Sequence, residues 1–255
     1  MVSRETSSED APARDAAEPP APPPVVAELY PTAVEPLAAY GELLATDGVV
    51  RGLIGPREVP RLWERHLLNC AVVEGLIGAD ATVADVGSGA GLPGLVLAIV
   101  RPDLRVTLVE PLLRRSTFLA EAVESLGLEN VEVVRSRVED LPRARRFDVV
   151  TARAVAALDR LATWCAPVIA PDGRMLALKG ERAEVELTEA DPVLVRLGLR
   201  HRRIVRLDAG GRVASTAVVE LARNAPPDGD GRDDRGSSVA ESAPTNQTGS
   251  EGRTP

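Results

Sequence analysis

Closely spaced glycines follow a short apolar run near the middle of the chain. The segment that spans residues 83–94 reads VADVGSGAGLPG. In it, one acidic residue precedes four glycines, in the order Asp85, Gly87, Gly89, Gly91 and Gly94. Because glycine has no Cβ, it lets the backbone approach a ligand closely and adopts a positive φ without a clash. An apolar strand, a glycine-rich turn and the start of a helix therefore predict a nucleotide-type ligand at the carboxyl edge of a parallel sheet.

The spacing of the glycines separates two kinds of nucleotide-binding loop. A dinucleotide-binding loop reads G-x-G-x-x-G and places a pyrophosphate at a helix N-terminus. The segment here more closely resembles the acidic-x-Gly-x-Gly-x-Gly loop of methyltransferases that use S-adenosylmethionine (SAM). A nicotinamide-dependent dehydrogenase and a nucleotide-binding module without catalysis are the alternatives from other classes, and calorimetry with SAM against NAD would separate them.

Other predicted strands end at the same edge of the sheet in residues that suit the same ligand. Glu110 ends the second strand, where a carboxylate can accept hydrogen bonds from both ribose hydroxyls. Val138 and Glu139 follow the third strand, where they would frame the adenine. Arg153 follows the fourth strand and can hold an anionic group, such as the SAM carboxylate or a phosphate. For each charged residue the alternative is an ordinary solvated surface charge.

The loop after the fourth strand also bears on the reaction. It reads TARA over residues 151–154, without the Asn-Pro-Pro-aromatic sequence that methyltransferases of exocyclic amines place here. A pyrimidine C5 methyltransferase would need a nucleophilic cysteine, and neither Cys70 nor Cys165 follows proline or lies on a strand-end loop. We therefore expect a methyl acceptor with its own lone pair and no proton to lose, and no catalytic general base.

Strand and helix patterns alternate along the chain, which predicts an α/β fold with helices on both faces of a parallel sheet. Strands are predicted at 82–86, 105–109, 131–134, 147–151 and 174–178, followed by a hairpin at 201–207 and 213–221. Helices are predicted at 29–45, 59–77, 92–100, 112–126, 158–169 and 183–197, with a turn at 171–173. This is the plan of the class I, Rossmann-like SAM methyltransferases: a mostly parallel seven-stranded sheet with an antiparallel strand from the terminal hairpin, preceded by N-terminal helices.

The two ends of the chain differ in composition from the rest. Residues 1–24 are rich in Pro, Ala and acidic side chains, and residues 225–255 contain no aromatic residue, Leu or Ile. Neither end can bury enough apolar surface to offset its ordering entropy. We therefore expect two disordered tails, dispensable for the chemistry, around one domain at residues 25–224. Most of the net charge of −8 falls in these tails, so an anionic partner of the domain is compatible with the composition.

The sequence also bears on the compartment and on metals. No basic segment followed by an apolar one marks a signal peptide, and no apolar run is long enough to span a bilayer. Cys70 and Cys165 have apolar neighbours and no metal-ligand spacing, which is typical of buried thiols in a reducing compartment. We therefore expect a cytoplasmic protein that acts as a monomer, without a metal and away from membranes.

Lysine is almost absent from the chain. Of the 30 basic residues a single one is lysine, Lys179. The bias toward Ala, Arg, Pro, Val and Gly suggests a GC-rich coding sequence that replaces Lys with Arg wherever the chemistry permits. A retained lysine then indicates a site that needs an ammonium, with chance survival as the alternative. Arginines gather after the third strand and in the last third of the chain, which suits phosphate contacts as well as a solvated charged face.

Five motifs together resemble those of one family, the 16S rRNA guanine-N7 methyltransferase G family, also called glucose-inhibited division protein B. The motifs are RHLLN at 65–69, with Asn69 where the family usually has Asp, DVGSGAGLPG at 85–94, SRVE at 136–139, RA at 153–154 and ALKG at 177–180. The resemblance covers about residues 29–221 and leaves both tails outside it.

This resemblance implies methyl transfer from SAM to N7 of a guanine in the 530 loop of 16S rRNA, either as free RNA or within the small ribosomal subunit. The residues it implies for SAM binding are Gly87, Leu92, Glu110, Val138, Glu139 and Arg153, and those facing RNA are Lys179, Arg137 and Arg212. Guanine N7 has a lone pair and no proton, so proximity can supply most of the rate. SAM-dependent methylation of a small molecule or a protein is the alternative.

Overall fold

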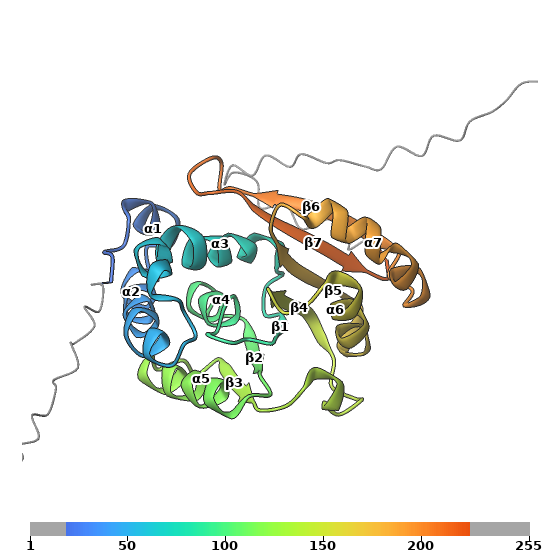
Figure 1. Cartoon of the computed structure of the whole chain (residues 1–255), viewed down its shortest axis with the longest axis horizontal. Helices are drawn as coiled ribbons and strands as arrows, with labels where there is room; N and C mark the ends of the chain where they lie inside the picture. Colours follow the sequence, from blue (N-terminus) through green and yellow to red (C-terminus); the bar gives the residue numbers. More distant parts are fainter. Residues whose placement is uncertain (1–18, 225–255) are drawn as a thin grey trace, which may run out of the picture.

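A mixed sheet of seven strands forms the centre of the molecule (Figure 1). The computed structural model describes residues 19–224, so residues 1–18 of the tail predicted at 1–24, and the whole tail predicted at 225–255, lie outside the described residues. The strands are β1 (Thr82–Val86), β2 (Arg105–Val109), β3 (Val131–Val134), β4 (Phe147–Arg153), β5 (Ile169–Lys179), β6 (His201–Leu207) and β7 (Thr216–Ala222). They lie in the order β3-β2-β1-β4-β5-β7-β6, with β7 antiparallel to both of its neighbours. This confirms the predicted mostly parallel sheet with a reversed strand from the terminal hairpin.

The central strands are mainly apolar on both sides, and successive side chains enter two different cores. Val149 packs with the core on one face of the sheet and Val150 with the core on the other. The first face is covered by α4 (Gly94–Val100) and α5 (Leu113–Ser125). The second is covered by α6 (Leu158–Cys165) and α7 (Ala183–Arg196), which pack on each other (Figure 1).

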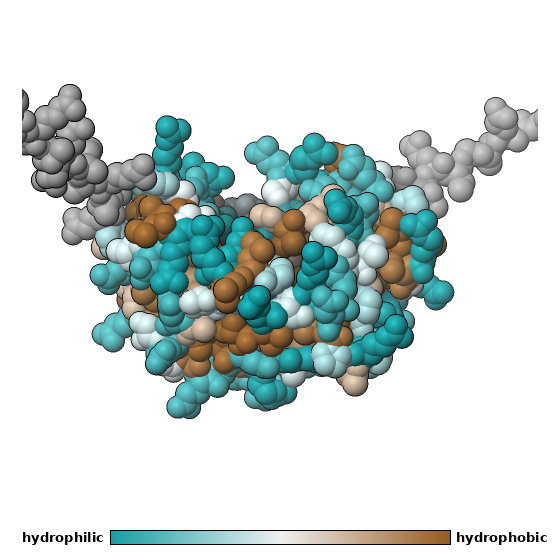
Figure 2. Space-filling view, turned by 60° about the horizontal axis from the view of Figure 1, so that its bottom comes forward, coloured by the Kyte–Doolittle hydropathy of each residue, from teal (hydrophilic) through white to brown (hydrophobic). Residues whose placement is uncertain are grey.

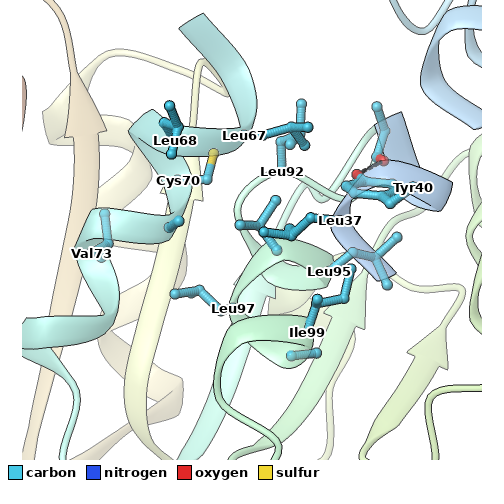
Figure 3. Close-up of a cluster of buried hydrophobic side chains, with 14 of the residues drawn as sticks. Leu37, Tyr40, Leu67, Leu68, Cys70, Val73, Leu92, Leu95, Leu97 and Ile99 are labelled. Carbon is cyan, nitrogen blue, oxygen red and sulfur yellow. Dashed lines mark hydrogen bonds between the residues drawn. The ribbon is translucent and has the colours of Figure 1, made fainter. Parts of the chain in front are cut away.

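The helix α4 needs a second cover because it is apolar all round: residues 94–99 are all buried. N-terminal helices supply this cover, and Leu37, Leu67 and Val73 point into the same cluster as Leu95 and Leu97 (Figure 3). The covering elements are α1 (Pro24–Leu29), α2 (Val34–Leu43), α3 (Leu68–Ala71) and the short helical turns η1 (Leu44–Gly48), η2 (Pro56–Arg61), η3 (Leu62–Leu67) and η4 (Val72–Leu76).

The two long helices predicted at 29–45 and 59–77 are therefore broken into shorter pieces. η1 and η3 are π-helical, and η2 and η4 are 3₁₀ turns. Pro56 and Pro60 lie in η2, where they lack the N–H that a continuous α-helix would use. The pattern of buried side chains was sufficient to predict helical structure, but it did not predict the local winding.

The folded part begins a few residues before the predicted boundary at Val25. α1 starts at Pro24, and the indole Nε1 of Trp63 donates a hydrogen bond of 2.7 Å to the carbonyl oxygen of Pro20. This contact joins the start of the described chain to η3. Residues 19–24 thus belong to the packed structure and not to a tail.

The predicted turn at residues 171–173 is wrong, because β5 runs through it without interruption. A Cβ on Gly173 would lie 2.8 Å from the carbonyl oxygens of Phe147 and Asp148, so glycine lets β5 approach the start of β4. The pairing of the two strands is irregular at this point. The Pro-Asp-Gly sequence therefore marks a bulge in a strand. The same three residue types are also common in turns, which is why the sequence predicted a turn here.

Candidate active site: a glycine-lined cleft at the carboxyl edge of the sheet

The glycine segment forms the turn between β1 and α4. Gly87, Gly89 and Gly91 have φ values of 68°, 58° and 94°, which side chains with a Cβ rarely adopt. The Gly87 N–H donates to the carbonyl oxygen of Val109 at 2.8 Å, and the Ser88 hydroxyl donates to the backbone oxygen of Asp85 at 2.8 Å. The turn is thus tied to β1 and β2 while one side of it stays free.

The glycines of this turn are needed for different reasons. A Cβ on Gly91 would lie 2.4 Å from Leu95 Cδ1, and one on Gly94 would lie 2.4 Å from Leu108 Cδ2. These two positions are closed by packing inside the protein. A Cβ on Gly89 would meet no protein atom nearer than 3.7 Å, so this position opens on the cleft.

Asp85 holds the turn from within the core. Its Oδ1 accepts a hydrogen bond from Thr151 Oγ1 at 3.0 Å, and its Oδ2 accepts from the Gly94 N–H at 3.2 Å. The carboxyl is fully buried, and this burial raises its pKa from the ordinary 3.8 to about 6. The residue thus links β1, β4 and the start of α4 and does not face the ligand.

Asp85→Asn should change how stability depends on pH. Because the folded pKa exceeds the unfolded one, the folded wild type binds more protons between these values and loses stability as pH rises through about 4 to 6. Between pH 4.5 and 7.5 we expect the free energy of unfolding of the wild type to fall by about 2 kcal/mol because of Asp85. The Asn variant should not show this decrease. Urea unfolding at both pH values measures this difference, and equal pH dependence in the two proteins would contradict it.

Glu110 closes the other side of the turn, at the end of β2. Its Oε2 accepts a hydrogen bond from the Gly89 N–H at 3.0 Å, and its Oε1 accepts from the Leu112 N–H at 3.0 Å. Arg115 Nη1 lies 3.8 Å from Oε2 of Glu110, and the Glu110 side chain is 2 % exposed. Each carboxylate oxygen has a second lone pair, so the group can still accept hydrogen bonds from a diol in the cleft.

Glu110→Ala should weaken SAM binding by about ten- to hundredfold, because it removes hydrogen bonds to a charged group worth about 1.5–3 kcal/mol. The change would also release the Gly89 and Leu112 N–H groups, which acts in the same direction. Isothermal titration with SAM measures the affinity, and Glu132→Ala, an exposed carboxylate on β3, is the control. A loss of SAM affinity under about twofold would mean that Glu110 only stabilises the glycine turn and does not contact the ligand.

The third wall of the cleft follows β3. The short 3₁₀ turn η5 (Val138–Asp140) begins here, and Arg137, Val138 and Glu139 all line the cleft. Val138 is buried, whereas Glu139 is exposed. An apolar side chain beside a carboxylate suits a flat base that carries an amino group.

Arg153 lies at the end of β4, where it joins the cleft to the N-terminal helices. Its guanidinium donates to the Arg65 carbonyl oxygen at 3.3 Å, to Cys70 Sγ at 3.4 Å and to His66 Nδ1. His66 Nε2 lies 3.0 Å from Glu58 Oε2, and burial with the neighbouring Arg153 lowers the pKa of His66. The imidazole is therefore neutral near pH 7, with its proton on Nε2 toward Glu58 and Nδ1 accepting from Arg153.

Asn69, which stands where the family motif usually has Asp, contacts the preceding helical turn. Its Nδ2 donates to the Arg65 carbonyl oxygen at 3.3 Å, while its Oδ1 is buried without a hydrogen bond. Asn69 does not line the cleft. Burial raises the pKa of the nearby Cys70 thiol to about 11, so this cysteine stays protonated.

The cleft formed by these elements has a volume of about 780 Å³, which suits a nucleoside-sized ligand. It brings together all six residues predicted for the cofactor, namely Gly87, Leu92, Glu110, Val138, Glu139 and Arg153. Arg137, predicted to face RNA, lines the same cleft. Other lining residues were not predicted from the sequence, among them Leu53, Ile54, Arg115 and Trp164, which do not stand at strand ends.

The rim of the cleft carries exposed apolar side chains. Leu112 is 54 % exposed and Val155 is 37 % exposed, and both line the cleft. On the face shown in Figure 2, hydrophobic side chains gather in a band that hydrophilic ones border. Exposed apolar surface rimmed by polar groups is typical of a binding site.

The other two residues predicted to face RNA lie outside this cleft, at the same edge of the sheet. Lys179 ends β5, and Arg212 lies in the turn between β6 and β7. Since Lys179 pairs with Ala217 near the start of β7, this turn is next to the carboxyl end of β5. Lys179 Nζ is paired with Glu186 Oε2 at 2.7 Å and is 8 % exposed, so it has little free charge for a phosphate.

Several arginines of the two predicted clusters have carboxylate partners. Arg145 pairs with Glu132, Arg203 with Glu220, Arg202 with Asp191 and Arg206 with Glu184. Arg137 and Arg212 form no ion pair with another described residue. Within residues 19–224, no three metal-ligating side chains gather at one place, and no helix is long and apolar enough to cross a membrane.

The strand order, the reversed β7 and the glycine turn after β1 define a class I SAM-dependent methyltransferase. The solved structure of mitomycin 7-O-methyltransferase MmcR has the same fold, with a TM-score of 0.53 at 21 % identity over 72 % of this chain and 60 % of that one. A family model described as rRNA small subunit methyltransferase G matches residues 33–214. The chain belongs to this family, which confirms the resemblance seen in its motifs.

Two curated relatives support this assignment over most of their length. Ribosomal RNA small subunit methyltransferase G of Nocardioides sp. (strain JS614) is 59 % identical over 182 residues, which is 71 % of this chain and 73 % of the relative. The protein of the same name from Mycolicibacterium gilvum (strain PYR-GCK) is 50 % identical over 216 residues, which is 82 % of this chain and 94 % of the relative.

Proposed function

We propose that this protein transfers the methyl group of SAM to N7 of a guanine in the 530 loop of 16S rRNA. The observation that carries the proposal is that one cleft collects every predicted cofactor residue and that all of them fall within the segment matched to the family, residues 33–214. The small ribosomal subunit or its rRNA is then the partner, and the protein acts in the cytoplasm as a monomer.

The donor set of the cleft fits SAM. In this proposal Glu110 accepts hydrogen bonds from the ribose hydroxyls, Val138 and Glu139 frame the adenine, and Arg153 pairs with the carboxylate of the amino acid part. Gly87 and Leu92 form the floor, and the open position at Gly89 gives the ligand its room. When bound, SAM supplies an electrophilic methyl group on its sulfonium.

The protein's own contribution is to orient and desolvate the acceptor. Guanine N7 carries a lone pair in the ring plane and no proton, so the transfer needs alignment and no general base. Two titratable side chains beside the cleft are engaged within the protein: Asp85 is fully buried and hydrogen-bonded in the core, and His66 is held by Glu58 and Arg153. Glu110 and Glu139, which line the cleft, are assigned to SAM in this proposal. Arg137 and Arg212 would hold phosphates around the target, and Lys179 would contact the RNA from the end of β5.

Mapping N7-methylguanine in 16S rRNA from cells with and without this gene tests the proposal. One guanine of the 530 loop should lose its N7 methyl in the deletion strain and regain it when the wild-type gene is returned. A plasmid that encodes Gly89→Val should fail to restore it. If no rRNA nucleotide changes, while purified protein still binds SAM, the acceptor is a small molecule or a protein.

A further inference from the structure

A second cavity, of about 480 Å³, adjoins the SAM cleft. The two share Ala154 and Val155, which follow β4, so the second cavity lies directly beyond the loop that faces the methyl donor. Its wall on the β4 side is made of small side chains, residues 154–157 reading AVAA. Its other wall holds Lys179 at the end of β5 and Glu186 on α7.

Lys179 and Glu186 form a fixed pair in this wall. Lys179 Nζ donates to Glu186 Oε2 at 2.7 Å and to the Ala156 carbonyl oxygen at 2.7 Å. The Leu158 N–H donates to the same Oε2 at 3.1 Å. The side chains are 8 % and 20 % exposed, so neither moves freely in solvent.

This arrangement leaves one donor and one acceptor side by side. An ammonium has three N–H donors, of which the described contacts use two. Glu186 Oε2 already accepts two hydrogen bonds, whereas Oε1 accepts none from residues 19–224. The wall of the cavity therefore presents a free N–H of Lys179 next to Oε1 of Glu186.

Guanine has the complementary pair on one edge. Its O6 accepts a hydrogen bond beside N1–H, which donates one, whereas adenine has the reverse order, with an N6 amino donor beside the N1 acceptor. Bases that are unstacked from RNA are commonly read by hydrogen bonds to this edge. Contacts to O6 and N1–H also leave N7 uncovered, as methyl transfer requires.

We propose that Lys179 and Glu186 form the base-recognition site of this enzyme. Lys179 Nζ donates to O6 and Glu186 Oε1 accepts from N1–H of an unstacked target guanine. This inference rests on the proposed function and gives Lys179 a contact with a base in place of a phosphate. It also gives a role to the ammonium that remains in a chain that otherwise uses arginine, because an ammonium donates three hydrogen bonds from a single compact atom.

The test uses small subunits reconstituted with 16S rRNA that carries guanine, inosine or 1-methylguanine at the target position. 1-Methylguanine keeps O6 and N7 but lacks N1–H, and inosine lacks only the 2-amino group. The wild-type full chain should use inosine within about threefold of guanine and should lose about ten- to hundredfold in kcat/KM on 1-methylguanine, the size expected for a hydrogen bond to a charged group.

Glu186→Ala tests whether Glu186 recognises the target base or only stabilises the structure. The variant should be slower on guanine by a similar factor, should lose its preference for guanine over 1-methylguanine, and should keep the wild-type affinity for SAM. Glu184→Ala removes an exposed carboxylate from the same helix and should keep the wild-type preference. Glu186→Gln, a neutral variant of the same shape, should show an intermediate preference if the Ala variant does not fold.

Two results would overturn the inference. One is wild-type enzyme that methylates 1-methylguanine as fast as guanine. The other is a folded Glu186→Ala variant that is slower but keeps the full preference for guanine, as expected of a structural residue. A wild type that methylates no guanine in these particles would instead overturn the proposed function.

Discussion

Gly89→Val is expected to weaken SAM binding by a hundredfold or more, at least about 2.7 kcal/mol, while the domain stays folded. A Cβ at this position meets no protein atom nearer than 3.7 Å, so the new side chain would extend into the cleft and occupy the space of the ligand. The positive φ of 58° adds strain of about 1–2 kcal/mol, which a domain of this size tolerates. Calorimetric titration with SAM and a thermal melt measure the two effects.

Gly94→Ala is the matched control for this prediction. Its Cβ would lie 2.4 Å from Leu108 Cδ2 and 2.8 Å from Asp85 Cβ, inside the core. We therefore expect Gly94→Ala to lower the melting temperature more than Gly89→Val does. A folded Gly89→Val protein with unchanged SAM affinity would show that the ligand does not lie against this turn.

Glu220→Ala is expected to lower the free energy of unfolding by about 1.5–3 kcal/mol, because it removes a buried carboxylate that pairs with two partly exposed arginines. Glu220 lies on β7 with a fully buried side chain. Its Oε1 is 3.3 Å from Arg174 Nη1 on β5, and its Oε2 is 2.8 Å from Arg203 Nε on β6. Without it, two guanidinium groups would face each other across β7 with no counter-charge.

Urea unfolding measures this loss, and Glu184→Ala gives the comparison. Glu184 pairs with Arg206, but both side chains are about half-exposed, so its removal should cost under about 1 kcal/mol. The two variants each remove one carboxylate that pairs with an arginine of β6. Equal losses in both would mean that burial adds nothing to the Glu220 network.

The elements that position the site were predictable where local signals agree. The predicted bounds of β1, β2, β3 and β6 match the structure. Short, mainly apolar runs define the first three, and the glycines at 210–211 mark the hairpin that follows β6. The cleft was predictable for a related reason: parallel strands place their carboxyl ends at one edge, so residues far apart in sequence, such as Gly87 and Glu139, line one cavity.

The rest depends on contacts between elements that no local pattern contains. Lys179 was predictable as a functional candidate because it is the single lysine. Its partner Glu186 lies on the next helix among several acidic residues, and the sequence does not indicate which of them pairs with Lys179. Arg203 looks free in the sequence because its carboxylate, Glu220, lies on the neighbouring strand. The π-helical windings of η1 and η3 likewise have no signal in the periodicity of the sequence.

Because Lys179 is the single lysine of the sequence, chemical modification of lysine probes the base-recognition site that we propose. Amine-reactive acylating reagents would find one side-chain ammonium in the 255 residues, and that ammonium is hydrogen-bonded to Glu186 and 8 % exposed. The rate at which such a reagent acylates Lys179 therefore measures how often the Lys179–Glu186 pair opens. Mass spectrometry can follow this rate without any label placed in the protein by mutation.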